Sequence, residues 1–231
     1  MKKLFTILTV IALTTTVSYA QFSAKAGLNM ANIVSNDNDS ENGMKLGMII
    51  GGNYAMELSD AMSLDVSLTF KQSGTKESDE ETSGGVTMKS TQTIALNYLD
   101  VSPSLSFNVS DAMSLSVGPY VAFALSGNLK WEYSAEGNGV DESESDSEAI
   151  DFGDGDDDDG IKAMDFGLNI GASYSINDAM SVSAGYALGL TNLMYIDDDM
   201  KDAYDAMDED LPSIKNSGIF LTFGYSFGGG Y

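Results

Sequence analysis

Apolar and polar residues alternate along eight stretches of the chain. In one of them, Met113, Leu115 and Val117 alternate with Ser114 and Ser116. A repeat of two is the signature of a β-strand, because successive side chains of a strand point to opposite faces. We therefore predict eight strands, at residues 22–33, 46–58, 62–71, 94–109, 113–126, 164–176, 180–189 and 219–227.

One of these predicted strands changes phase. Ile94, Leu96 and Tyr98 share one face, whereas from Leu99 to Val109 the apolar side chains stand mostly at odd-numbered positions. A β-bulge inserts one extra residue into a strand and exchanges its two faces. We therefore predict a bulge near Tyr98 and Leu99.

Three near-copies of one peptide mark the turns. Residues 59–64, 110–115 and 177–182 each read Ser or Asn, then Asp, Ala, Met and Ser, then an aliphatic residue. Ser, Asn and Asp favour tight turns because their side chains hydrogen-bond to the nearby backbone. Each copy leads directly into an alternating stretch, so we interpret the copies as short turns between hairpin strands.

The four other connections are long and acidic. They cover roughly residues 34–43, 73–90, 132–161 and 195–215, and they hold 28 of the 35 acidic residues. Short turns at one end and long polar loops at the other are typical of outer-membrane β-barrels. The sequence thus predicts an all-β fold, an eight-stranded antiparallel up-and-down transmembrane barrel with short periplasmic turns and long acidic extracellular loops.

The last of these loops contains a helical pattern. Met200, Ala203, Tyr204 and Met207 recur at the spacing of one helix face. We predict a short helix there, which either folds over the barrel mouth or is presented to a partner.

The alternation alone does not say which face is outside. A soluble, secreted lipocalin-like barrel would fill its interior with large apolar side chains and expose charge. Here the second face is mostly Gly, Ser, Ala, Asn and Thr, which suits the crowded lumen of a narrow membrane barrel. A few charged residues on this face could pair inside: Lys25, Lys45, Glu57, Asp65, Lys71 and Asp165. We expect the membrane form, with the soluble barrel as the alternative.

Residues 1–20 have the pattern of a secretory signal peptide. Two lysines precede a mostly apolar run at residues 4–13, and Ser18 and Ala20 place small residues at −3 and −1 before Gln21. A membrane anchor would need a longer apolar run. We expect Sec-type export, signal-peptide cleavage and insertion of residues 21–231, as one barrel domain, into the cell outer membrane by the barrel-assembly machinery.

Four segments resemble a known family. Residues 25–32 (Lys-Ala-Gly-Leu-Asn-Met-Ala-Asn) resemble the opening strand of the PorT-like outer-membrane β-barrel family of Bacteroidota. Residues 97–103 are similar to its Tyr-Leu-Glu-Ile-Pro segment, with Ser102 inserted before the proline. Residues 117–121 and 185–192 also match, although Gly185 stands where an arginine is usual. The resemblance implies an eight-stranded outer-membrane barrel. Most members have no defined activity, and one namesake supports protein secretion.

Composition excludes several functions. The net charge is −24 and all 11 basic residues are lysine, so the chain lacks the cationic face that nucleic-acid binding requires. There is no cysteine and no histidine, which removes disulfides, the usual zinc sites and any imidazole base. The known enzyme types among small membrane barrels use a histidine. We therefore expect no enzymatic activity.

One acidic run invites a calcium hypothesis. Asp154, Asp156, Asp157, Asp158 and Asp159 lie within a Gly-containing segment, and calcium prefers several carboxylate ligands on a tight turn. The spacing departs from that of an EF-hand, because Asp159 stands where the loop glycine should be and Asp165 where the bidentate Glu should be. We expect weak divalent-cation binding by a solvated loop, and no dedicated cofactor.

Two functions remain open for such a barrel. One is a structural or surface-interaction role, in which the acidic loops bind cations or partners loosely. The other is an accessory role in outer-membrane transport or protein secretion. The sequence predicts lipid as the surrounding partner and does not name a protein partner.

Overall fold

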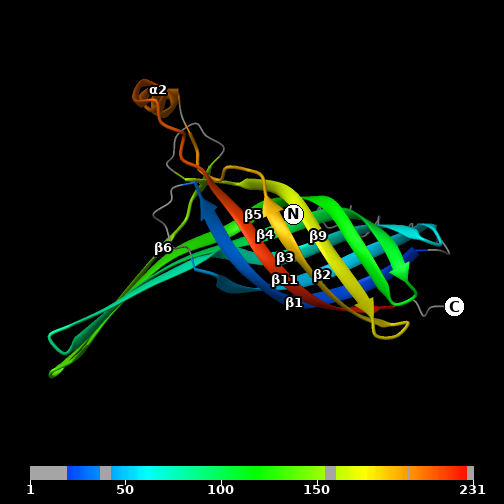
Figure 1. Ribbon diagram of the computed structural model, residues 1–231, viewed down its shortest axis with the longest axis horizontal. Coiled ribbons are helices and arrows are strands. Elements are labelled where there is room, and N and C mark those ends of the chain that lie inside the picture. The colour runs from blue at the N-terminus through cyan, green and yellow to red at the C-terminus, as the bar shows by residue number, and fades with distance from the viewer. Residues whose placement is uncertain (1–19, 37–42, 154–159, 197, 228–231) are drawn as a thin grey trace, which may run out of the picture.

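The computed structural model describes residues 20–36, 43–153, 160–196 and 198–227. Its main feature is a closed ring of antiparallel strands (Figure 1). In the order in which they pair, the strands are β1 (Ala20–Ser35), β2 (Lys45–Ser59), β3 (Met62–Ser83), β4 (Val86–Ser110), β5 (Met113–Gly137), β9 (Met164–Ser175), β10 (Met180–Gly189) and β11 (Ile214–Ser226). Strand β11 pairs back with β1 and closes the ring, which confirms the eight-stranded up-and-down barrel.

The outside of the ring is apolar and the inside is polar. Leu115, Val117 and Ile170 are 49%, 43% and 57% exposed on the outer surface. Ser116 and Asn169, which alternate with them, line the interior. The soluble-barrel alternative is therefore wrong, because its interior would hold the large apolar side chains.

The three repeated peptides form the short turns, as predicted. They join β2 to β3, β4 to β5 and β9 to β10, and Figure 1 shows them together at one end of the barrel. In the third turn the Asn177 side-chain oxygen accepts hydrogen bonds of 2.9 Å from the backbone N–H groups of Ala179 and Met180. This explains why Asn and Ser recur at the start of each copy.

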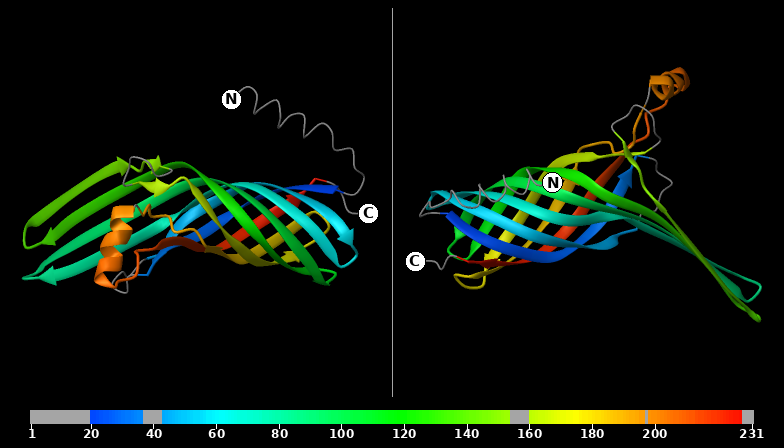
Figure 2. Two further views of the ribbon diagram at one scale, coloured as in Figure 1. Left: turned by 90° about the horizontal axis from the view of Figure 1, so that it is seen from above. Right: turned by 180° about the vertical axis from the view of Figure 1, so that it is seen from behind.

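Two of the predicted loops are β-hairpins instead. Strands β3 and β4 continue through residues 73–90, and β5 pairs with β6 (Val140–Ala149) across most of residues 132–161. Figure 2 shows both hairpins projecting together from the end opposite the short turns. Hydroxyl side chains pair across the strands, such as Thr82 with Thr87 at 2.9 Å, and threonine favours strands despite the acidic composition.

The tips of the hairpins explain why these strands form. Gly84 and Gly85 have φ of 59° and 81°, and Asn138 and Gly139 have φ of 47° and 84°. Two successive residues with positive φ make the type I′ turn that closes a two-residue hairpin, for which Gly-Gly and Asn-Gly are preferred. The turn chemistry was present in the sequence within segments that the charge pattern assigned to loops.

The predicted bulge exists, but it lies in the neighbouring strand. Strand β4 keeps one register with β3 along the whole pairing. In the pairing of β4 with β5, Asn97 faces Ser126 and Tyr98 faces Ala124, so Leu125 of β5 is the extra residue. The phase of β4 changes because Leu96 and Tyr98 point inward, where they are fully buried.

The remaining described segments lie at the hairpin end. Strands β7 (Phe152–Gly153) and β8 (Ile161–Lys162) form a short parallel pair. The predicted helix is α2 (Asp198–Met207), which buries none of its residues and stands away from the barrel in Figure 1. In the described ranges, no helix is both long and apolar enough to cross a membrane.

Candidate functional site

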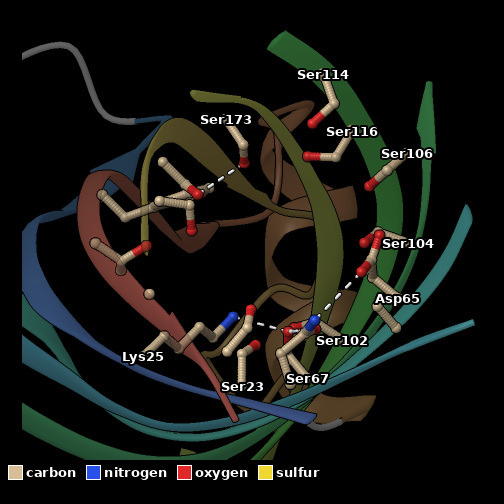
Figure 3. A pocket seen from close by; sticks show the side chains of 18 of the residues that line it. Ser23, Lys25, Asp65, Ser67, Ser102, Ser104, Ser106, Ser114, Ser116 and Ser173 are labelled. Carbon is tan, nitrogen blue, oxygen red and sulfur yellow. Dashed lines mark hydrogen bonds between the residues drawn. The ribbon is translucent and has the colours of Figure 1, made fainter. Parts of the chain in front are cut away.

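A polar cavity of about 340 Å³ occupies the barrel interior. Its wall is mainly Ser, Asn and Thr, and Figure 3 shows Ser106, Ser114 and Ser116 pointing into it. Asn177 and Asp178 of the third turn also line it, so the cavity reaches the short-turn end. These small hydroxyl and amide side chains stand at the strand positions that alternate with the outward-facing apolar residues.

One hydrogen-bonded chain crosses the wall of this cavity. The Lys25 Nζ atom donates to Ser67 Oγ at 2.8 Å, and Ser67 Oγ donates to Asn53 Oδ1 at 2.9 Å (Figure 3). Asn53 Nδ2 then donates to Asp65 Oδ1 at 3.2 Å. The chain links β1, β2 and β3 and connects a cation to a carboxylate through two neutral side chains.

A direct ion pair lies deeper in the barrel. The Lys71 Nζ atom lies 2.7 Å from Asp100 Oδ2 and 4.3 Å from the centre of the Tyr120 ring. Ser102 donates to the other oxygen of Asp100, and Asn169 donates to Ser102 at 3.2 Å. The Asp100 carboxylate is therefore bound on both oxygens, and the Lys71 ammonium has a second favourable contact with an aromatic face.

A third interior carboxylate, that of Asp165, lies in a network of buried polar groups. The Tyr120 hydroxyl donates to Asp165 Oδ2 at 3.1 Å, and Asn216 Nδ2 donates to the same oxygen at 3.0 Å. Asn216 also contacts the Tyr98 hydroxyl at 3.3 Å and accepts from Ser73 Oγ at 3.1 Å. Four strands, β3, β4, β5 and β9, are thereby tied to β11 across the lumen.

Large side chains close the barrel beside this network. Tyr98 and Tyr120 are 0% and 1% exposed and form one buried cluster with Ile33, Leu96, Ala122 and Ala187. Phe152 and Ile161, from the short parallel pair, pack against the cluster from the hairpin side. The polar cavity is thus separated from the hairpin end by packed aromatic and aliphatic side chains.

The expectation of internal charge pairing is met for Lys71, whose partner Asp100 was not among the residues named. Lys25, Asp65, Lys71 and Asp165 all face the interior and take part in the networks described above. Lys45 is half-buried. Glu57 stands opposite Ser63 on the inward-facing side, but it is exposed at the short-turn end and does not pair inside the barrel.

Sequence reasoning missed Asp100 and Asn216. The phase change at Tyr98 hid the fact that Asp100 shares the inward face with that tyrosine. Asn216 precedes the stretch that alternates clearly. Leu96 and Tyr98 face inward at even-numbered positions of β4. Extending this alternation past Tyr98 would have placed Asp100 on the inner face.

The calcium hypothesis concerns residues whose structure is not described. Asp154, Asp156, Asp157, Asp158 and Asp159 all lie outside the described residues. Within the described ranges, no group of three or more Asp, Glu, His or Cys side chains is arranged to hold a metal ion.

A closed antiparallel ring with an apolar outer surface defines a transmembrane β-barrel, because only a closed sheet satisfies all its backbone groups in lipid. Residues 12–195 match the family model described as outer membrane protein beta-barrel domain. Since this match spans most of the chain, the protein belongs to that family and is a small outer membrane protein. The matched region ends before β11, the strand that closes the ring.

Several solved structures are similar to this barrel. Ail, the attachment invasion locus protein of Yersinia pestis, shares 14% identity with a TM-score of 0.42, over 90% of this chain and 99% of that chain. Neisserial surface protein A shares 12% identity with a TM-score of 0.41 over the same shares of the two chains. CarO of Acinetobacter baumannii shares 10% identity with a TM-score of 0.35, over 85% of this chain and 95% of that chain. No curated protein matches the chain in sequence.

Proposed function

We propose that this protein is a closed outer-membrane barrel with a surface-interaction role, and that it does not act as a diffusion channel. The observation that carries the proposal is the buried cluster around Leu96, Tyr98 and Tyr120, which fills the lumen between the polar cavity and the hairpins. A barrel of eight strands has little interior space to begin with. What remains available to partners is the large hairpin sheet beyond the barrel.

The orientation is part of the proposal. We place the short turns in the periplasm and the hairpins outside the cell, since outer-membrane barrels have short periplasmic turns and longer extracellular segments. Residues 1–20 then act as a cleaved signal for Sec-type export, and the barrel-assembly machinery inserts the chain. Membership of the PorT-like group of Bacteroidota fits the four matching segments and belongs to the same proposal.

No catalytic role is proposed. The interior carboxylates of Asp65, Asp100 and Asp165 are held in hydrogen bonds to Asn53, Lys71 and Asn216. A carboxylate that acts as acid or base in catalysis needs a substrate within hydrogen-bond reach. The acidic residues of the projecting segments are proposed to attract divalent cations loosely, Asp154 and Asp156 to Asp159 among them.

Conductance of the purified barrel in planar bilayers tests the channel question. The unmodified protein is expected to be silent, and a Tyr98→Ala/Tyr120→Ala variant is expected to conduct, because two large side chains of the closing cluster are removed. Circular dichroism checks that the variant keeps its strands. Steady conductance by the unmodified protein would contradict the proposal and favour the alternative, an accessory role in transport or secretion.

A further inference from the structure

Beyond the barrel, four strands form a single sheet that has solvent on both sides. We call it the hairpin sheet and define it as residues 76–83 of β3, 86–93 of β4, 130–137 of β5 and 140–147 of β6. Residues directly opposite each other in antiparallel pairs lie on the same face. One row across the sheet is therefore Glu77, Gln92, Trp131 and Asp146.

This row belongs to the face that continues the inner wall of the barrel. The next row toward the barrel contains Ile94 opposite Leu129, and Ile94 packs against the buried interior cluster. We call this side the luminal face of the hairpin sheet. The opposite side continues the outer surface of the barrel.

The two faces differ in charge. The luminal face carries carboxylates and no lysine, whereas the outer face combines three lysines with four carboxylates, Glu80, Glu132, Glu136 and Asp141. Six carboxylates stand on the luminal face, in one column on each outer strand: Glu77, Asp79 and Glu81 on β3, and Glu142, Glu144 and Asp146 on β6. Lys76, Lys89 and Lys130, the lysines of the hairpin sheet, all lie on the other face. There Lys130 lies 2.8 Å from Glu132, and this hydrogen bond holds the pKa of the Glu132 carboxyl below its usual value.

Two aromatic side chains stand between the acidic columns. Trp131 and Tyr133 are two residues apart on β5 and therefore lie on the same face, where they are 38% and 42% exposed. Exposed aromatic rings beside carboxylates are a good environment for cations, because a ring face attracts positive charge and the carboxylates add to the attraction. The same carboxylates repel lipopolysaccharide phosphates and acidic polysaccharides.

The dimensions of the luminal face suit an extended chain. Rows on one face repeat about every 6.6–6.8 Å along the strands, and the two acidic columns are about 14 Å apart because three strand spacings separate them. An extended polypeptide has the same repeat for every second side chain. Basic side chains from such a peptide, lying along β4 and β5, would reach the carboxylates on either side.

We propose that the luminal face of the hairpin sheet binds an extended lysine- or arginine-rich polypeptide segment, with its cationic groups over Trp131 and Tyr133 and between the two acidic columns. This inference rests on the proposed surface-interaction role and specifies its partner. Such a peptide would contact several rows of the sheet at once, which distinguishes it from a free metal ion.

The chain contains one tryptophan, so its fluorescence reports on this face directly. The probe is a ten-residue peptide of alternating Lys and Ser, titrated into the full-length barrel in nanodiscs of neutral lipid. We expect a saturable change in Trp131 emission. A peptide of alternating Glu and Ser should cause none.

Two matched variants separate the faces. The luminal variant carries Glu77→Gln, Asp79→Asn, Glu144→Gln and Asp146→Asn, and the outer variant carries Glu80→Gln, Glu132→Gln, Glu136→Gln and Asp141→Asn. Both lose four negative charges from the same sheet. The luminal variant should bind the basic peptide about tenfold more weakly or worse, and the outer variant within about twofold of the unmodified protein. Tyr133→Ser should weaken binding about three- to tenfold while it leaves the charge unchanged.

Several results would overturn the inference. Equal weakening by both variants would show general attraction to an acidic protein. An emission change that depends on protein concentration without peptide would identify a second copy of the chain as the occupant. If the barrel does not bind the peptide but remains electrically silent, this inference alone is refuted. Steady conductance would instead refute the proposed function. Circular dichroism of each variant confirms that the strands are retained.

Discussion

The Lys71 ammonium lies 2.7 Å from the Asp100 carboxylate, and the two side chains are only 11% and 4% exposed. They come from adjacent strands, β3 and β4, at the level where the polar cavity meets the closing cluster. An ion pair removed from bulk water depends on both partners, because either charge alone would be buried without compensation. The stability of the barrel therefore depends on both charged side chains of this interior pair being present.

Replacing Lys71 with Met should destabilise the barrel by about 3 kcal/mol, since Asp100 would lose its counter-charge. Adding Asp100→Asn should restore most of the loss. The measurement is urea unfolding in lipid vesicles, with Lys76→Met on the exposed hairpin as a control expected within about 0.5 kcal/mol of the unmodified protein. A double variant no more stable than Lys71→Met alone would contradict the pairing argument.

Ile170→Arg should cost about 2–4 kcal/mol in a bilayer, because it places a charge on the lipid-facing surface. The same unfolding assay measures it. The control is Ser143→Arg, which introduces the same charge on an exposed strand of the hairpin sheet and should change the stability very little. If Ile170→Arg were harmless, the outer surface would not be in contact with lipid.

Single cysteines provide a test of the orientation, because the natural chain has none. Ser143→Cys on β6 should react with a membrane-impermeant maleimide on intact cells. Asp111→Cys, in the second short turn, should react only after the outer membrane is opened. Labelling in the reverse order would place the hairpins in the periplasm.

Calcium should bind weakly to the acidic segments, with dissociation constants of about 10⁻⁴–10⁻³ M or weaker. The reason is that the carboxylates of the acidic run do not follow the spacing of a dedicated calcium loop. Calorimetry of the purified barrel measures this directly, and Asp156→Asn should change the heat only slightly. One stoichiometric micromolar site that disappears in Asp156→Asn would instead establish a specific calcium site.

The sequence predicted the barrel well because each strand exposes one face to lipid and the other to a polar lumen. This produced clear alternation at residues such as Leu115 and Ser116. The prediction of strand faces from alternation failed where that contrast ends. At Leu96 and Tyr98 the interior itself becomes apolar, so the pattern changed phase without an extra residue in β4.

Beyond the membrane neither face is apolar, so alternation gave no signal in the hairpin sheet. Charge suggested loops there, whereas the Gly84-Gly85 and Asn138-Gly139 turns specified hairpins. The interior networks could be anticipated only in part. Lys71 and Asp165 stood out as charges on a small-residue face, but their partners depend on which strands the ring brings together.

The pairing of Ser23 with Ser226 joins opposite ends of the described chain. Until residues 214–226 have been synthesised, β1 and β10 are both open edges, and open edges do not persist in hydrocarbon because their N–H and C=O groups lack partners. Contacts between such distant residues also form slowly. Assembly is therefore all-or-none: a chain that ends before Ile214 would not insert as a weaker barrel but would fail to insert at all, and the other strands must remain competent for folding until β11 is available.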